Sequence, residues 1–96
     1  EMERNFMLKF LEASLKNDFM NARKIYYESK KQNSYEFQGF LEDLRKQTLK
    51  APLRQLDKAN ILNTIGKVDA QAINISSEEP HLMSLVFQLG NLSNTN

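Results

Sequence analysis

The chain has 96 residues, 26% of them charged and 41% hydrophobic, with thirteen Lys and Arg against twelve Asp and Glu. This near-balance excludes the strong electrostatic field that steers proteins to nucleic acid or to a membrane surface. The absence of cysteine excludes disulfides and thiolate metal sites. With no signal peptide and no apolar run of the roughly 18 residues that cross a bilayer, we expect a single cytoplasmic domain.

The sequence of the N-terminal half predicts three helices. The first is expected over residues 2–16, with apolar side chains spread over a wide arc. Asp18 then caps a second helix that runs to about residue 31, because its carboxylate accepts a backbone N–H and places negative charge at the helix start. A polar turn follows, with Ser34 as the expected N-cap of a third helix over 35–49. The third helix carries one apolar stripe, made of Phe37, Phe40, Leu41, Leu44 and Thr48.

A fourth helix is expected over residues 58–75. Pro52 ends the third helix and opens a short connector, because proline cannot donate a backbone hydrogen bond. Asp57 is the expected N-cap of the fourth helix. One face of this helix is apolar at the spacing i, i+4, i+7, i+11 and i+14. The residues of this stripe are Ile61, Ile65, Val68, Ala72 and Ile75.

A fifth helix follows a polar hinge at residues 76–80. Ser77 is its expected N-cap, which places Pro80 in the first turn, where the missing N–H costs little. Gly90 is the expected C-terminal stop. A second apolar stripe lies on this helix, made of Leu82, Leu85, Val86, Leu89 and Leu92.

No segment alternates with the period of two that half-buried strands require, so the sequence predicts an all-α fold. We expect a single five-helix bundle over residues 1–92 and a frayed tail at 93–96. Broad apolar stripes that carry no catalytic side chain are typical of helices that pack against other helices. The chain is therefore expected to be a packing and assembly module.

Side chains that could carry chemistry are scarce. His81 is the only histidine, and with Glu78 and Glu79 it lacks the i, i+4 spacing and the further ligands that a metal site needs. Glu42 and Asp43 are adjacent on a helix and point in different directions, so they do not form an acid–base pair. No glycine-rich loop can hold a phosphate. We expect no catalytic, metal or cofactor site in these residues, no small-molecule substrate and no enzymatic activity.

Basic residues gather at two places along the chain. Their simplest interpretation is the solvated face of amphipathic helices, and the alternative is a weak phosphate-contacting strip on a helical nucleic-acid binder. The two groups are Arg23, Lys24, Lys30 and Lys31, and Arg45, Lys46, Lys50, Arg54 and Lys58.

Two stretches resemble the C-terminal domain of clamp-loader subunits. The run 10–19 (FLEASLKNDF) followed by 40–45 (FLEDLR) is similar to the start of that domain, where an apolar helix, a polar turn and a Phe-Leu-x-x-Leu-Arg helix follow one another. The run 61–69 (ILNTIGKVD) followed by 76–82 (SSEEPHL) resembles the last two helices and their linker in the bacterial DNA polymerase III gamma/tau subunit. The C-terminal segments of the related delta subunit and of the replication factor C small subunits are similar to this one. The chain departs from the gamma/tau pattern in its short third connector and in having no charged anchor at 84–90.

The resemblance implies a collar domain that packs side by side with its counterparts and holds ATPase modules together while they load a sliding clamp onto primed DNA. Since the sequence begins at Glu1, not at methionine, we expect those modules upstream in a longer protein. The partners would be other clamp-loader subunits, and DNA would be involved only indirectly.

The alternative, from another class of function, is a small intracellular helical adaptor that binds a partner helix in a groove. For the clamp-loader interpretation, the oligomer interface is expected on the outer edges of the last two helices. The expected interface residues are Ile61, Leu62, Ile73, Leu82, Met83 and Phe87.

Overall fold

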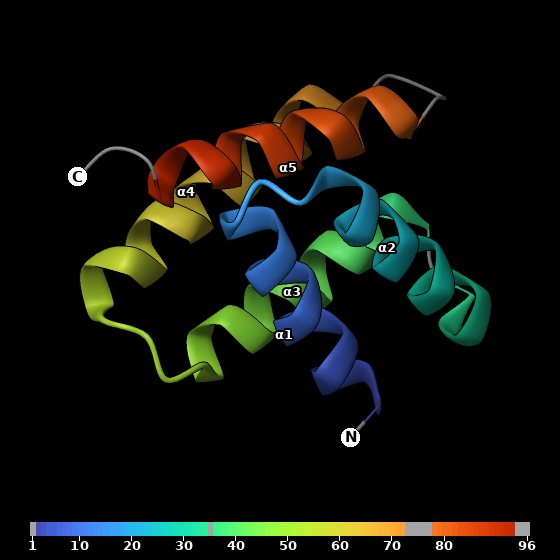
Figure 1. Cartoon of the computed structure of the whole chain (residues 1–96), viewed down its shortest axis with the longest axis horizontal. Helices are drawn as coiled ribbons and strands as arrows, with labels where there is room; N and C mark the ends of the chain where they lie inside the picture. Colours follow the sequence, from blue (N-terminus) through green and yellow to red (C-terminus); the bar gives the residue numbers. More distant parts are fainter. Residues whose placement is uncertain (1, 35, 73–77, 94–96) are drawn as a thin grey trace.

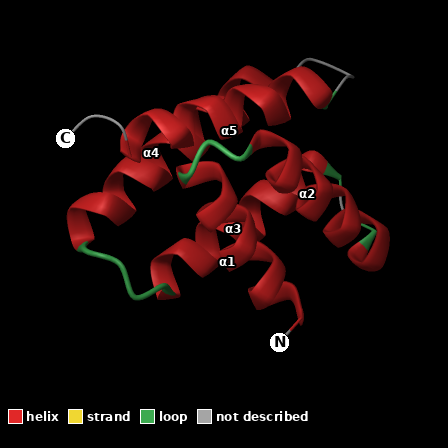
Figure 2. Ribbon diagram, in the orientation of Figure 1, coloured by secondary structure: helices red, strands yellow, loops and turns green. Residues whose placement is uncertain are grey.

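The computed structural model describes residues 2–34, 36–72 and 78–93. Across these residues the chain forms five helices and no strand (Figures 1 and 2). The helices are α1 (Met2–Leu15), α2 (Phe19–Asn33), α3 (Phe37–Lys50), α4 (Gln55–Ala72) and α5 (Glu79–Ser93). The expectation of an all-α five-helix bundle is confirmed.

Helix α1 is the centre of the bundle, since it packs against α2, α3 and α5. Helix α4 packs against α3 and α5, and α2 also packs against α5. Figure 1 shows α4 and α5 side by side along the upper edge, with the connector from α3 to α4 at the lower left. The bundle measures 34 × 30 × 22 Å. None of the described helices is long and apolar enough to span a membrane.

A group of aromatic rings fills the core between α1, α2 and α3. Phe10, Tyr26 and Phe40 are fully buried. The Phe40 ring lies edge to face with both others, with centroids 5.0 Å from Phe10 and 4.7 Å from Tyr26. Such pairs contribute about 0.5–1.5 kcal/mol beyond the burial of their surface. The rings therefore fix the relative positions of the three N-terminal helices.

The apolar stripes of the last two helices complete the core, as the sequence predicts. The buried members of these stripes are Ile61, Ile65, Val68, Ala72, Leu82, Leu85, Val86 and Leu89. Leu92 is partly buried and packs against the same core, and Ile75 lies outside the described residues. Periodicity predicted this part of the packing because all members of a stripe lie on one face of a regular helix.

The junction between α1 and α2 matches the expected cap. Asp18 accepts the backbone N–H of Asn21 at 3.4 Å, and the preceding Asn17 has a left-handed backbone with φ 63°. The expected stop at Gly90 is wrong, because α5 continues to Ser93. Gly90 instead lies where α5 crosses the end of α1. A Cβ at this position would overlap the Asn17 side chain and lie 3.2 Å from the carbonyl oxygen of Ser14.

Two other expected caps are wrong. Ser34 ends α2 with a left-handed backbone (φ 57°) and donates its N–H to the carbonyl of Lys30, so it is a C-cap. Glu36 occupies the N-cap position of α3 without a side-chain cap bond. Asp57 lies inside the first turn of α4 and binds Arg54 at 3.1 Å. Pro80 lies in the first turn of α5, as expected, whereas the expected cap at position 77 is outside the described residues.

Candidate functional site: the seam between α2 and α5

The face on which α2 meets α5, here called the α2–α5 seam, has a charged half and an apolar half. We call the charged half the clasp; it consists of Arg23, Tyr26, Tyr27 and Lys30 of α2 with Glu78 and Glu79 at the start of α5. We call the apolar half the apolar hollow; it is lined by Asn17, Phe19, Met83, Val86 and Phe87.

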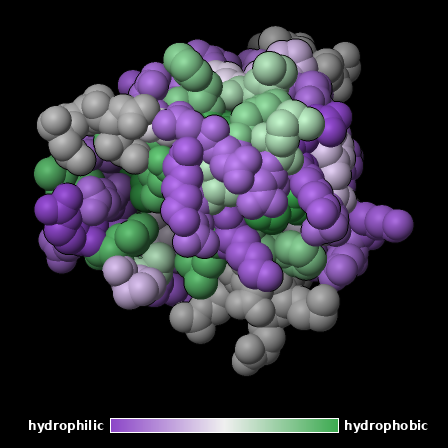
Figure 3. Space-filling model, in the orientation of Figure 1, coloured by the Kyte–Doolittle hydropathy of each residue, from purple (hydrophilic) through white to green (hydrophobic). Residues whose placement is uncertain are grey.

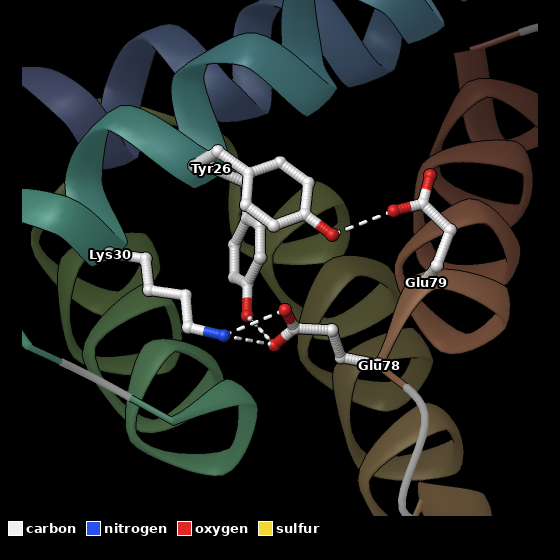
Figure 4. A network of polar contacts seen from close by, with 5 residues as sticks. Tyr26, Lys30, Glu78 and Glu79 are labelled. Atoms are coloured by element: carbon white, nitrogen blue, oxygen red, sulfur yellow. Dashed lines mark hydrogen bonds and ion pairs between the residues drawn. The ribbon is translucent and has the colours of Figure 1, made fainter.

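Glu78 joins the clasp through both carboxylate oxygens. The Lys30 ammonium donates to them at 2.8 and 2.7 Å, and the Tyr26 hydroxyl donates at 2.7 Å. Figure 4 shows these groups converging from α2 on the carboxylate at the start of α5. Since Tyr26 is fully buried, Glu78 provides the partner that its hydroxyl needs inside the protein.

Glu79 makes a parallel set of contacts one residue later. Arg23 donates from Nε at 2.7 Å to one oxygen, and the Tyr27 hydroxyl donates at 2.6 Å to the other. The Arg23 guanidinium also lies 5.0 Å from the centre of the Tyr27 ring, a cation–π geometry. All four carboxylate oxygens of the two glutamates therefore accept hydrogen bonds from α2.

Burial and hydrogen bonding set the protonation states of the clasp. Partial burial raises the pKa of Glu78, but hydrogen bonds from Lys30 and Tyr26 outweigh this effect and hold the pKa below its ordinary value. The hydrogen bond from Arg23 lowers the pKa of Glu79, with a further contribution from Tyr27. Burial, followed by the bond to Glu79, raises the pKa of Tyr27 to about 12. The clasp thus holds ionised carboxylates opposite protonated tyrosines at neutral pH.

Burial also raises the pKa of Tyr26, and its bond to Glu78 raises it further. Neither tyrosine is therefore poised to give up its proton near neutral pH. These carboxylates accept bonds from fixed donors, which is the arrangement of a structural network. Among the described residues, no group of three His, Cys, Asp or Glu could hold a metal ion.

The apolar hollow lies between the start of α2 and the middle of α5. Phe87 is 66% exposed and Met83 is 48% exposed, although both are large apolar side chains. Met20, which follows Phe19 on α2, is 69% exposed. Helix α5 contains one glutamate and no Lys, Arg or Asp, so its own contribution to this surface is nearly free of charge. Figure 3 shows hydrophobic residues over α5 in the upper part of the face, hydrophilic residues across its centre, and further hydrophobic residues at its left and lower left.

The six expected interface residues differ in their exposure to solvent. Met83 and Phe87 are exposed and line the apolar hollow, and Leu62 is partly exposed on α4. The assignments of Ile61 and Leu82 to the outer surface are wrong, because these side chains are 2% and 0% exposed and belong to the core. They lie on the inward stripes of their own helices. The sixth, at position 73, is outside the described residues.

Sequence reasoning missed the clasp and the contribution of α2 to the hollow. The four donors of α2 lie on one helical face at the spacing i, i+3, i+4 and i+7, and two acidic residues begin α5. That spacing could have indicated from the sequence that the four donors of α2 share one polar surface. The partners are 48 to 56 residues apart, however, and no local pattern pairs such distant segments.

Comparison with known proteins yields no family model, no curated protein and no solved structure that matches this chain.

Proposed function

We propose that the chain is an assembly module whose apolar hollow packs against a helix of a partner subunit. The observation that carries the proposal is the exposure of Met83 and Phe87 beside a hollow on a nearly uncharged helix. Clustered aromatic and methionine side chains are typical of the cores of protein interfaces, where charged residues are depleted. A partner side chain placed in the hollow would contact Phe19 and Phe87 together.

We further propose that the assembly is a clamp loader and that the chain is the collar domain of a gamma/tau-like subunit. The five-helix architecture and the sequence resemblance support this assignment. In this role the collar holds sister subunits side by side while ATPase modules open a sliding clamp and place it on DNA. The partners are other clamp-loader subunits, and this domain contributes no catalytic group.

The apolar hollow also suits the second candidate, a helical adaptor, because recognition of a helix in a groove uses the same kind of apolar surface. The two proposals differ in the partner. A collar domain associates with clamp-loader subunits, whereas an adaptor leaves them unbound and binds an unrelated amphipathic helix.

Native mass spectrometry of the chain, alone and mixed with bacterial gamma, delta and delta-prime subunits, tests the proposal. We expect a complex with at least one of these subunits. The double variant Met83→Ser/Phe87→Ser should weaken it at least about tenfold, a loss of about 1.4 kcal/mol. The matched control Leu49→Ser/Leu56→Ser removes two exposed leucines outside the seam and should leave the complex intact. A chain that stays unbound with every subunit contradicts the collar role.

A further inference from the structure

A second surface lies at the opposite end of the bundle from the clasp, where α3 ends and α4 begins (lower left in Figure 1). We call residues 46–58 the basic end; its charged members are Lys46, Lys50, Arg54 and Lys58 with the acidic Asp57. The Lys58 ammonium donates to the backbone carbonyl of Leu49 at 2.8 Å, which ties the first turn of α4 to the last turn of α3. Basic side chains of two helices and their connector are thereby brought together.

The basic end concentrates positive charge in a chain that is otherwise slightly acidic. Residues 46–58 contain four basic residues and one acidic residue, which leaves nine basic and eleven acidic residues in the rest of the chain. Lys58 offsets the negative end of the α3 dipole, and Arg54 is paired with Asp57. Lys46 and Lys50 are exposed, and neither forms an ion pair within the part of the chain that the structure describes.

Two leucines of the basic end are exposed. Leu49 is 56% exposed at the end of α3, and Leu56 is 67% exposed at the start of α4. Between them Leu53 is only partly buried against the core. Phosphate groups of a nucleic acid would pair with the lysines but would leave both leucines uncovered. A second copy of the same surface would cover the leucines but would place lysine against lysine.

We propose that the basic end docks an acidic amphipathic helix of a partner protein. Apolar residues of that helix cover Leu49 and Leu56, and its carboxylates face Lys46 and Lys50. An amphipathic helix fits because it presents an apolar stripe and flanking carboxylates on one side. Charge complementarity selects an acidic partner and speeds its encounter with this end of the bundle. This surface is separate from the apolar hollow, so its role does not depend on the proposed collar function.

The probe for this proposal is a synthetic peptide of about 15 residues, with leucine and phenylalanine at i, i+3, i+4 and i+7 and glutamates on both flanks. We expect nuclear magnetic resonance titration of the whole chain to give a Kd below about 500 µM, with shifts centred on residues 46–58. The variants Lys46→Glu/Lys50→Glu and Leu49→Ser/Leu56→Ser should each weaken binding at least about tenfold. Lys9→Glu/Lys67→Glu reverses two exposed lysines outside residues 46–58; it is the matched control and should bind as the unchanged chain does.

Three results overturn the proposal. The first is the absence of shifts at about 2 mM peptide, and the second is binding that neither variant at the basic end weakens. The third is the binding of duplex DNA or of vesicles containing phosphatidylglycerol through Lys46 and Lys50 when the peptide does not bind. That third outcome would identify a phosphate-binding surface in place of a protein-docking surface. A peptide with glutamine for every glutamate separates the charge contribution, and it should bind more weakly than the acidic probe.

Discussion

The two halves of the α2–α5 seam are built from the same pair of helices, yet only the clasp gives its side chains partners within the chain. In the clasp, Glu78 and Glu79 accept hydrogen bonds from four donor residues of α2 at 2.6–2.8 Å. In the apolar hollow, Met83 and Phe87 remain largely exposed on the same helix only one and two turns further along. The clasp completes its contacts within the chain, whereas the hollow leaves apolar surface that a partner could cover.

This difference predicts which substitutions change the stability of the fold and which change binding to a partner. A side chain with all its partners inside the chain contributes to folding, and its removal leaves buried polar groups without hydrogen bonds. An exposed apolar side chain contributes little to folding, since its surface stays in contact with water in both states. Substitutions in the clasp should therefore lower stability, and substitutions in the hollow should change association.

The largest expected effect compares two aromatic residues of the seam. Tyr26→Ala removes a fully buried ring and should lower the free energy of unfolding by about 3–5 kcal/mol. Phe87→Ala removes a ring that is 66% exposed and should change the same quantity by no more than about 0.5 kcal/mol. Urea denaturation followed by circular dichroism measures both. Equal losses in the two variants would show that the hollow is part of the folding core.

A smaller effect is expected from opening the clasp. Glu78→Ala leaves the buried Tyr26 hydroxyl without its partner and should cost about 1–3 kcal/mol. Glu42→Ala, at an exposed position of α3, is the control and should change stability by less than about 0.5 kcal/mol. In a Tyr26→Phe background the Glu78→Ala loss should shrink, because the orphaned hydroxyl is gone. A loss that is the same in both backgrounds would contradict the role of the Tyr26–Glu78 bond.

The crossing of α5 over α1 allows a matched pair of glycine substitutions. Gly90→Ala should destabilise the fold by about 1 kcal/mol, because the added methyl displaces Asn17, which lines the hollow, and crowds the Ser14 carbonyl. Gly66→Ala should instead stabilise it by about 0.5–1 kcal/mol, since the position is exposed in α4 and no atom lies within 4 Å of the new Cβ. Thermal unfolding of both variants measures whether Gly90→Ala lowers the stability and Gly66→Ala raises it.

The smallest expected effect is the pH dependence of the clasp. The pKa values of Glu78 and Glu79 are lower in the folded chain than the ordinary value of 4.5. Their contribution to stability is therefore fully present above about pH 5 and is lost as the pH falls through the folded-state values. Glu78→Gln/Glu79→Gln should reduce the loss of unfolding free energy between about pH 6 and pH 3. A pH profile unchanged by this double variant would contradict ionised carboxylates in the clasp.

The sequence predicted the core better than it predicted the seam. Ile65, Val68 and Leu85 follow from helical periodicity, which is a local property of each helix. Ile61 and Leu82 belong to the two apolar stripes, so their expected place on the outer edges conflicted with the same periodicity, and the structure follows the periodicity. The caps at Asp57 and Ser34 failed for a different reason: a cap depends on where the helix begins, and Ser34 ends α2 instead of starting α3.

The clasp needed information that a single sequence does not contain. In the sequence its two glutamates stand out only beside His81, where they lack the spacing of a metal site. Their actual contacts with Arg23 and Lys30 require α2 and α5 to meet, and that meeting depends on the packing of both helices with α1. The hollow was partly predicted, since Met83 and Phe87 were placed on the outer edge of α5, whereas the contribution of Phe19 was not.

Hydrogen–deuterium exchange of the chain, free and mixed with the clamp-loader subunit that it is proposed to bind, tests assembly through the apolar hollow. We expect slower exchange in the complex on α5 around Met83 and Phe87 and on the first turns of α2, with exchange at the end of α3 unchanged. Protection confined to α3 and the start of α4, with α5 exchanging as it does in the free chain, would contradict assembly through the apolar hollow.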